Sequence, residues 1–170
     1  MTNDILFSER QKFRQWWLWL IILGINAVFL LGTYKQIALG EQFGDKPMSN
    51  GALLLTVGLL LLITIFFLAL RLDTTIKRDG IYVQFFPFHF TPRHYDWGTF
   101  TKSYVRRYSP LMEYGGWGLR FGLFGSGTAF NVSGNKGLQL EFTNGKKLLI
   151  GTNKPEELIQ ALTKLGQLKS

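Results

Sequence analysis

The stretch ALLLTVGLLLLITIFFLAL, residues 52–70, contains no charged residue and ends at Arg71. A second uncharged stretch, WWLWLIILGINAVFLLGTY, lies before it at residues 16–34. A helix rises 1.5 Å per residue, so each stretch would extend ~28 Å, close to the ~30 Å hydrocarbon core of a bilayer. A buried soluble helix as long as residues 52–70 would show polar residues at helical spacing. The two stretches therefore predict two transmembrane helices.

Aromatic residues stand at both ends of the first stretch: Trp16, Trp17 and Trp19 at one end, and Tyr34 at the other. Such amphipathic rings favour the interface between membrane and water. A cleaved signal peptide is the alternative interpretation. The stretch is long for the apolar region of such a peptide, and no small-x-small cleavage site follows it. An uncleaved membrane anchor is therefore favoured.

Lysine and arginine residues near the spans predict the orientation of the chain, because cytoplasmic flanks are enriched in them. Three such residues precede the first span, and three follow the second span within the next eight positions. The connecting loop, residues 35–51, has two, beside two acidic residues. We therefore expect both termini in the cytoplasm and the loop outside. The flanking basic residues are Arg10, Lys12, Arg14, Arg71, Lys77 and Arg78, and those of the loop are Lys35 and Lys46.

After residue 71 the pattern changes to short runs rich in β-branched and aromatic residues. Two turn signals, Asp79-Gly80 and Asn144-Gly145, predict tight hairpins between such runs. The runs alternate with glycine-rich or polar connections, as expected of an all-β domain. The seven candidate strands are residues 74–78, 81–86, 100–109, 119–124, 128–132, 138–142 and 146–150.

The chain is predicted to close with a helix at residues 154–165. Asn153 and Glu156 have the spacing of a helix-capping box, and Gly166 suits the position just after the helix. An apolar stripe of Leu158, Ile159, Leu162 and Leu165 follows helical spacing. We expect this stripe to cover an open end of a β sandwich or barrel, in preference to lying on a membrane surface.

These patterns together predict a two-helix transmembrane hairpin plus an all-β sandwich or barrel of about seven strands, capped by a C-terminal α-helix. Residues 1–71 would contain a cytoplasmic N-terminal segment and the two spans. Residues 72–170 would form one cytoplasmic domain.

Three segments within residues 72–165 resemble the bacterial pleckstrin-homology-like (PH-like) membrane proteins. The segments are YSPLMEYGGWGLR at 108–120, AFNVSGNKGLQL at 129–140 and KLLIGT at 147–152. They are similar to an uncharacterised two-helix anchored type common in Bacteroidetes-like bacteria. The resemblance implies a PH-like β domain, a multi-pass protein of the bacterial inner membrane, and a role in binding or assembly.

The segment GGWGLR, residues 115–120, suggests a binding site. Tyr114 and Trp117, if exposed beside Arg120, would offer the three residue types most common at interface hot spots. The alternative is structural: the glycines would permit a bend where a strand turns a corner. The two interpretations are compatible if the bend presents the tryptophan.

Basic residues dominate the region after the second span. From Arg71 onward there are 14 lysines and arginines against 7 acidic residues, a net charge of +7. Lys102 and Arg106 lie on one predicted strand and complete the candidate binding set. Anionic lipid would attract such a domain by about 1 kcal/mol per basic residue near the surface.

Several classes of function lack their sequence signature. The chain has no cysteine, which excludes disulfides and thiolate chemistry. His89 and His94 flank a proline-containing loop, and an ordinary polar loop is favoured over a zinc site. Gly125-Ser-Gly127 does not continue into a dinucleotide fingerprint. We therefore predict no catalytic, metal or cofactor site, and no binding of nucleic acid, because no recognition motif accompanies the charge.

The sequence favours a non-enzymatic, membrane-anchored binding or scaffold module. Its partner would be a protein or the anionic headgroups of the inner leaflet. The alternative is a structural subunit of a larger membrane complex, accessory to a transporter or a membrane enzyme.

Overall fold

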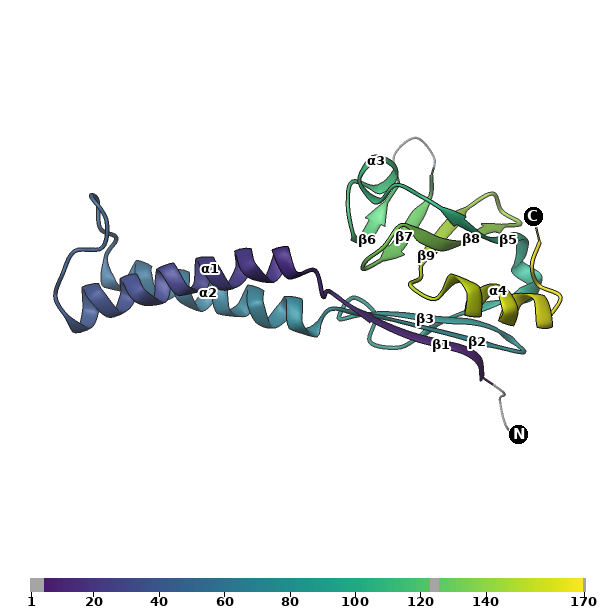
Figure 1. The fold of residues 1–170 in the computed structure, drawn as a ribbon, viewed down its shortest axis with the longest axis horizontal. Coiled ribbons are helices and arrows are strands. Elements are labelled where there is room, and N and C mark those ends of the chain that lie inside the picture. Colours follow the sequence, from purple (N-terminus) through teal and green to yellow (C-terminus); the bar gives the residue numbers. More distant parts are fainter. Residues whose placement is uncertain (1–4, 123–125, 170) are drawn as a thin grey trace. The chain divides into compact units, whose positions relative to one another are not determined.

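The computed structural model describes residues 5–122 and 126–169, shown in Figure 1. The chain divides into two compact units. One is helical and comprises residues 14–69. The other is built mainly of β-strands and comprises residues 5–13 together with residues 70–169.

The helical unit is an antiparallel pair. Helix α1 (Trp16–Thr33) continues into a short π-helical turn, η1 (Tyr34–Ala38), and α2 (Asn50–Ala69) returns. A polar contact joins the helices: the Asn26 side-chain amide of α1 donates to Thr64 Oγ1 of α2 at 3.0 Å. The same amide also donates to the Ile22 carbonyl within α1 at 2.8 Å. Most apolar side chains of both helices are exposed. Both predicted helices are confirmed, and each is long and apolar enough to cross a membrane.

The first sheet joins the two ends of the helical insertion. It has four antiparallel strands in the order β1-β2-β3-β4: β1 (Ile5–Lys12), β2 (Arg71–Lys77), β3 (Gly80–Phe86) and β4 (Arg93–Asp96). Strand β1 precedes α1 and pairs with β2, which follows α2. Both helices are therefore inserted between two neighbouring strands of one sheet.

The second sheet has five strands in the order β5-β8-β9-β7-β6. Its pairs are antiparallel except for β7 with β9, which run parallel. The strands are β5 (Phe100–Arg107), β6 (Gly118–Phe121), β7 (Thr128–Asn131), β8 (Lys136–Phe142) and β9 (Lys147–Gly151).

The described residues thus form nine strands, where the sequence predicted about seven. The seven predicted runs correspond to β2, β3 and β5–β9, although Phe124, the predicted end of one run, lies outside the described residues. The two additional strands are β1 and β4. Strand β4, with the sequence RHYD, is short and polar. In β1 the buried face includes Glu9 and Gln11, so the usual alternation of apolar and polar residues is absent.

Buried polar side chains of β1 connect the two sheets. The Glu9 carboxylate accepts hydrogen bonds from Thr152 Oγ1 at 2.6 Å and from the Asn153 backbone N–H at 2.9 Å. The Gln11 side-chain amide donates to the Gly151 carbonyl at 2.7 Å. Because buried polar groups need partners, these bonds make β1 an integral part of the β unit.

The C-terminal helix α4 (Pro155–Lys164) is confirmed to within one residue at each end. Leu158 and Leu162 are buried, whereas Ile159 of the predicted stripe is partly exposed. Gly166 adopts φ 65° and its N–H donates to the Thr163 carbonyl at 3.0 Å, while the following N–H donates to the Leu162 carbonyl at 2.9 Å. These two bonds form a Schellman motif and confirm the predicted C-terminal glycine.

The predicted capping box is wrong. Lys154 occupies the N-cap position, and its backbone N–H donates to Thr152 Oγ1 at 3.0 Å. Asn153 is unable to cap the helix because its backbone N–H donates to Glu9 and its side chain pairs with Ser133.

The two predicted hairpins both form. In the first, the two turn residues are Arg78 and Asp79, one position earlier than predicted, and Gly80 already pairs with Lys77. In the second, Gly145 has φ 79° and its N–H donates to the Phe142 carbonyl at 2.9 Å. This turn closes the hairpin between β8 and β9.

Candidate functional site

The predicted binding segment around residues 115–120 is largely structural. Tyr114 is 2% exposed, so the expectation that it is exposed is wrong. Its hydroxyl donates to the Ser126 carbonyl at 3.1 Å, and its ring lies edge-on to Tyr108, with centroids 6.0 Å apart. Burial raises the pKa of Tyr114, and it raises the pKa of Tyr108 to about 12. Both phenols are neutral core residues at neutral pH.

Arg106 is also engaged in a structural contact. Its Nη2 lies 2.7 Å from Glu113 Oε2, and its Nε donates to Gln139 Oε1 at 3.0 Å. The same guanidinium reaches the Tyr114 hydroxyl at 3.4 Å. Arg106 lowers the pKa of Glu113, which keeps this carboxylate ionised. The positive charge of Arg106 is therefore already neutralised within the fold.

Tyr114 belongs to a short helix that the sequence reading treated as part of a bend. Helix α3 (Pro110–Tyr114) is capped by Ser109, whose backbone N–H donates to Glu113 Oε1 at 2.8 Å. Gly115 ends it with a left-handed φ of 67°. Gly115 thus terminates a short helix, whereas the sequence had predicted a bend in a strand.

The remaining predicted site residues lie in two places. Arg120 is exposed and its Nε donates to the Trp117 carbonyl at 3.0 Å. Trp117 is half-buried and its indole N–H donates to the Gly134 carbonyl at 3.3 Å. Lys102 is exposed on β5, opposite Glu141 of β8. The structure therefore brings Arg106 together with Tyr114, and Arg120 together with Trp117.

The two histidines have separate structural environments. His89 is buried, its Nδ1 accepts the Phe85 N–H at 3.3 Å, and burial together with the nearby charge of Arg93 lowers its pKa. His94 stacks on Tyr82, with ring centroids 4.5 Å apart. Within residues 5–122 and 126–169, no group of three or more His, Cys, Asp or Glu side chains is placed to hold a metal ion.

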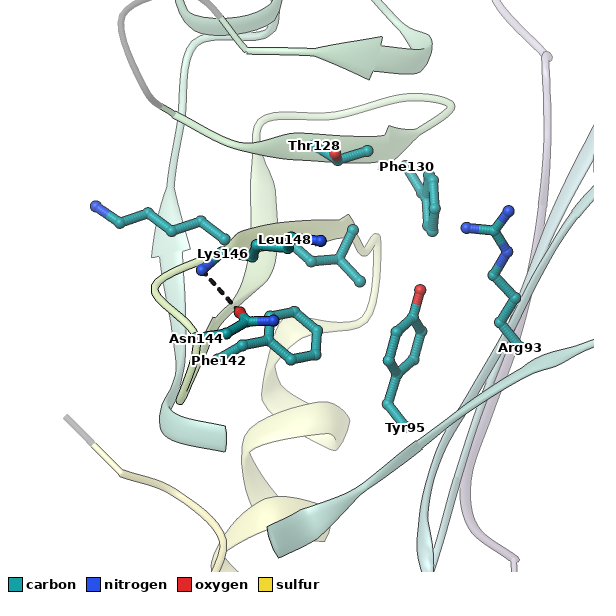
Figure 2. Close-up of a pocket in the computed structure, with 9 residues that line it drawn as sticks. Arg93, Tyr95, Thr128, Phe130, Phe142, Asn144, Lys146 and Leu148 are labelled. Atoms are coloured by element: carbon teal, nitrogen blue, oxygen red, sulfur yellow. Dashed lines mark hydrogen bonds between the residues drawn. The ribbon is translucent and has the colours of Figure 1, made fainter. Parts of the chain in front are cut away.

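A cleft of about 290 Å³ lies elsewhere in the β unit, between β4 of the first sheet and β7, β8 and β9 of the second (Figure 2). Its apolar surface comes from Phe130, Phe142 and Leu148. Phe130 and Leu148 are buried, and the Phe142 ring packs on those of Tyr95 and Phe100 at 5.7 and 5.1 Å. This floor is continuous with the core, so its shape is fixed by core packing.

Basic residues line the rim of this cleft. Arg93, Lys146 and Lys147 are all exposed, and within the described part of the chain none of them has a carboxylate partner. Figure 2 shows Arg93 and Tyr95 reaching from β4 toward Phe130. The Asn144 side chain accepts the Lys146 backbone N–H at 3.0 Å, which fixes the turn that carries the two lysines. The cleft thus combines unpaired positive charge with a rigid apolar floor.

The sequence reading did not identify this cleft. Lys146 and Lys147 directly follow the predicted turn at Asn144-Gly145, and this pair of adjacent lysines was the one sign of the cleft in the local sequence. Arg93 lies more than fifty positions earlier on a strand that was not predicted. Only the packing of one sheet against the other brings these cations to a common apolar floor.

No protein-family model, curated protein or solved structure matches this chain. Its function therefore has to be argued from the geometry of the cleft.

Proposed function

We propose that the protein is a non-enzymatic, membrane-anchored binding module whose cleft receives an acidic segment of a partner protein. One observation carries this proposal: Arg93, Lys146 and Lys147 line the cleft beside a preformed apolar floor, and within the described residues none of them has a carboxylate partner. An anionic group held above such a floor gains charge complementarity together with apolar contact.

The edge strand β4 supports an extended peptide as the occupant. In the described part of the chain, β4 pairs only with β3 and forms one edge of the first sheet. The unpaired backbone groups of an edge strand can bind an extended chain by β-augmentation. Arg93 and Tyr95, which lie two positions apart on β4, both line the cleft. A bound strand would thus meet backbone partners and side-chain contacts together.

Anchoring through α1 and α2 is part of the same proposal. Their length and exposed apolar surfaces support insertion, and the basic residues flanking the spans support a cytoplasmic β unit. Two sheets followed by a C-terminal helix support a PH-like description of this unit. A bacterial inner-membrane location is proposed from the sequence resemblance. An anionic lipid headgroup is the other ligand that the charge of the cleft would accept.

The test uses the full chain in phosphatidylcholine nanodiscs and a fluorescein-labelled hexapeptide of alternating glutamate and phenylalanine. Fluorescence anisotropy measures its affinity. We expect R93Q and K147Q each to weaken binding about tenfold, because a desolvated charge pair contributes on the order of 1.4 kcal/mol or more. K102Q is the matched control, since it removes one exposed positive charge outside the cleft.

Equal weakening by K102Q and K147Q would show only diffuse charge attraction and would contradict the assignment of the cleft. A peptide with glutamine in place of glutamate should bind far more weakly. The protein could instead bind phosphatidylglycerol vesicles and not the peptide. If R93Q and K147Q weaken that vesicle binding, the ligand is a lipid headgroup. Co-purification of a stoichiometric multi-helix partner from native membranes would instead favour a structural subunit.

A further inference from the structure

The loop between β3 and β4, residues 87–92, exposes two aromatic side chains that the cleft does not use. Phe88 is 51% exposed and Phe90 is 81% exposed. Single exposed apolar residues are common on protein surfaces, but two phenylalanines on one short loop form a local apolar projection.

The loop is held in a defined conformation. The Gln84 side-chain amide donates to the carbonyls of His89 at 3.1 Å and Phe90 at 2.9 Å. The His89 N–H donates to the Phe85 carbonyl at 2.8 Å, and the Phe85 N–H donates to His89 Nδ1 at 3.3 Å. Buried His89 therefore fixes the loop from inside, while the phenylalanines on either side of it keep much of their surface exposed.

This loop lies at the end of the sheet where the chain enters and leaves the β unit. Lys12 pairs with Arg71, and Arg71 pairs with Phe86, so these three residues form the terminal row of the first sheet. Arg71 comes two residues after Ala69, the last residue of α2. Two extended residues span at most ~7 Å. Chain connectivity alone therefore keeps the row close to any bilayer that contains α2.

The residues around the loop suit the interfacial layer of a membrane. The Arg71 guanidinium forms an ion pair with Asp73, with Nε 3.2 Å from Oδ2, and lies 5.0 Å from the centroid of the Phe86 ring. The Phe90 ring packs edge-on against Phe86 at 6.1 Å. Lys12 is exposed on the same row. Aromatic rings favour the headgroup region, and basic side chains beside them attract anionic lipid.

We infer that residues 87–92 form a membrane-interfacial anchor, in which Phe88 and Phe90 insert among the lipid headgroups of the leaflet that adjoins the β unit. Lys12 binds lipid phosphate beside them. The inference rests on the proposed insertion of α1 and α2. It adds a third point of attachment, which restrains how the β unit can turn about its two connections.

The test exploits the absence of cysteine from the chain. Single variants F90C, M112C and L55C of the full chain are spin-labelled and reconstituted in vesicles of phosphatidylcholine and phosphatidylglycerol. Electron paramagnetic resonance then compares collision of the label with oxygen, which concentrates in lipid, and with a water-soluble nickel chelate. Met112 is the matched control, because it is 79% exposed on α3 and is comparable to Phe90 in exposure. Leu55 reports insertion of α2 itself.

We expect the ratio of oxygen accessibility to nickel accessibility at position 90 to be at least about three times that at position 112. The ratio should be highest at position 55. A water-like ratio at position 90 with a lipid-like ratio at position 55 would overturn the anchor while leaving the transmembrane hairpin intact. A water-like ratio at position 55 would overturn the insertion of α2 and, with it, the anchor.

Discussion

The α3 segment, residues 109–120, and the cleft both combine aromatic and basic residues, but they use them in opposite ways. In the α3 segment, Arg106 from β5 pairs with Glu113 at 2.7 Å and Tyr114 is buried. In the cleft, Arg93 and Lys147 have no carboxylate partner in the described part of the chain, and the aromatic floor faces the cavity. Residue type alone therefore does not mark a binding site. What matters is whether the fold already satisfies the side chain.

The largest expected effect tests whether Tyr114 belongs to the core. Replacing it by alanine removes a buried aromatic ring, so Y114A should lower the free energy of unfolding by about 3–5 kcal/mol. Thermal or urea unfolding of the full chain in detergent measures the loss. Binding of the acidic peptide per folded molecule should not change. A stable Y114A variant that has lost peptide binding would reverse the roles given to the two regions.

A smaller effect is expected for the ion pair between Arg106 and Glu113. Both side chains are mostly buried, so a double-mutant cycle with R106Q and E113Q should give a coupling energy of about 1 kcal/mol. The exposed pair of Lys136 and Glu156, 3.4 Å apart, is the control and should show no measurable coupling. Equal coupling in the two pairs would contradict a structural role specific to Arg106.

The cleft should show the reverse pattern, with binding affected and stability unchanged. R93Q and K147Q should alter the free energy of unfolding by no more than about 0.5 kcal/mol, because exposed residues without partners contribute little. The same variants should weaken the acidic peptide about tenfold, as proposed above. Unfolding curves and anisotropy titrations on the same preparations decide the point. Marked destabilisation by either variant would make the cleft resemble the α3 segment.

The smallest effect concerns pH and the histidine behind the cleft floor. The His89 ring lies 5.3 Å from that of Phe130, and burial, aided by Arg93, lowers the pKa of His89. Between the unfolded pKa of about 6.5 and the lower folded value, the unfolded chain binds more protons. The contribution of His89 to stability is therefore complete above about pH 6.5 and is lost as the pH falls through the folded pKa.

Unfolding midpoints measured from pH 7.5 down to pH 5.5 should reveal this dependence. We expect H89N to flatten the slope and R93Q to make it shallower, because Arg93 is the second cause of the shift. H94Q is the control, since His94 stacks on Tyr82 on the outer face of the first sheet. A slope that disappears in H94Q rather than in H89N would contradict the environment described for the cleft floor.

The sequence predicted those elements whose signals are local. The uncharged runs predicted both helices, Asn144-Gly145 predicted a hairpin, and Gly166 predicted the end of α4. Strand β1 was missed because Glu9 and Gln11 occupy its buried face, and their partners, Thr152, Asn153 and Gly151, lie about 140 positions away. Such pairing depends on tertiary contacts and leaves no periodic signal.

The candidate site was harder to predict for the same physical reason. The motif GGWGLR is conspicuous in the sequence, but the burial of Tyr114 depends on packing against Tyr108 and on the Ser126 carbonyl. The cleft needs Arg93, Phe130 and Lys147, which come from two sheets. Local sequence reveals turns and helix ends, whereas the accessibility of a side chain is a property of the whole fold.

The pairing of β1 with β2 has a consequence for how the chain is made. Strand β1 leaves the ribosome before its partner β2, which follows only after residues 13–70 have been synthesised. Closing a flexible loop of that length has an entropic cost, which falls when α1 and α2 form an antiparallel pair that brings the strand ends together. Formation of the helical hairpin therefore favours completion of the first sheet. The Glu9 carboxylate finds its buried partners later still, because Thr152 and Asn153 are synthesised after β2.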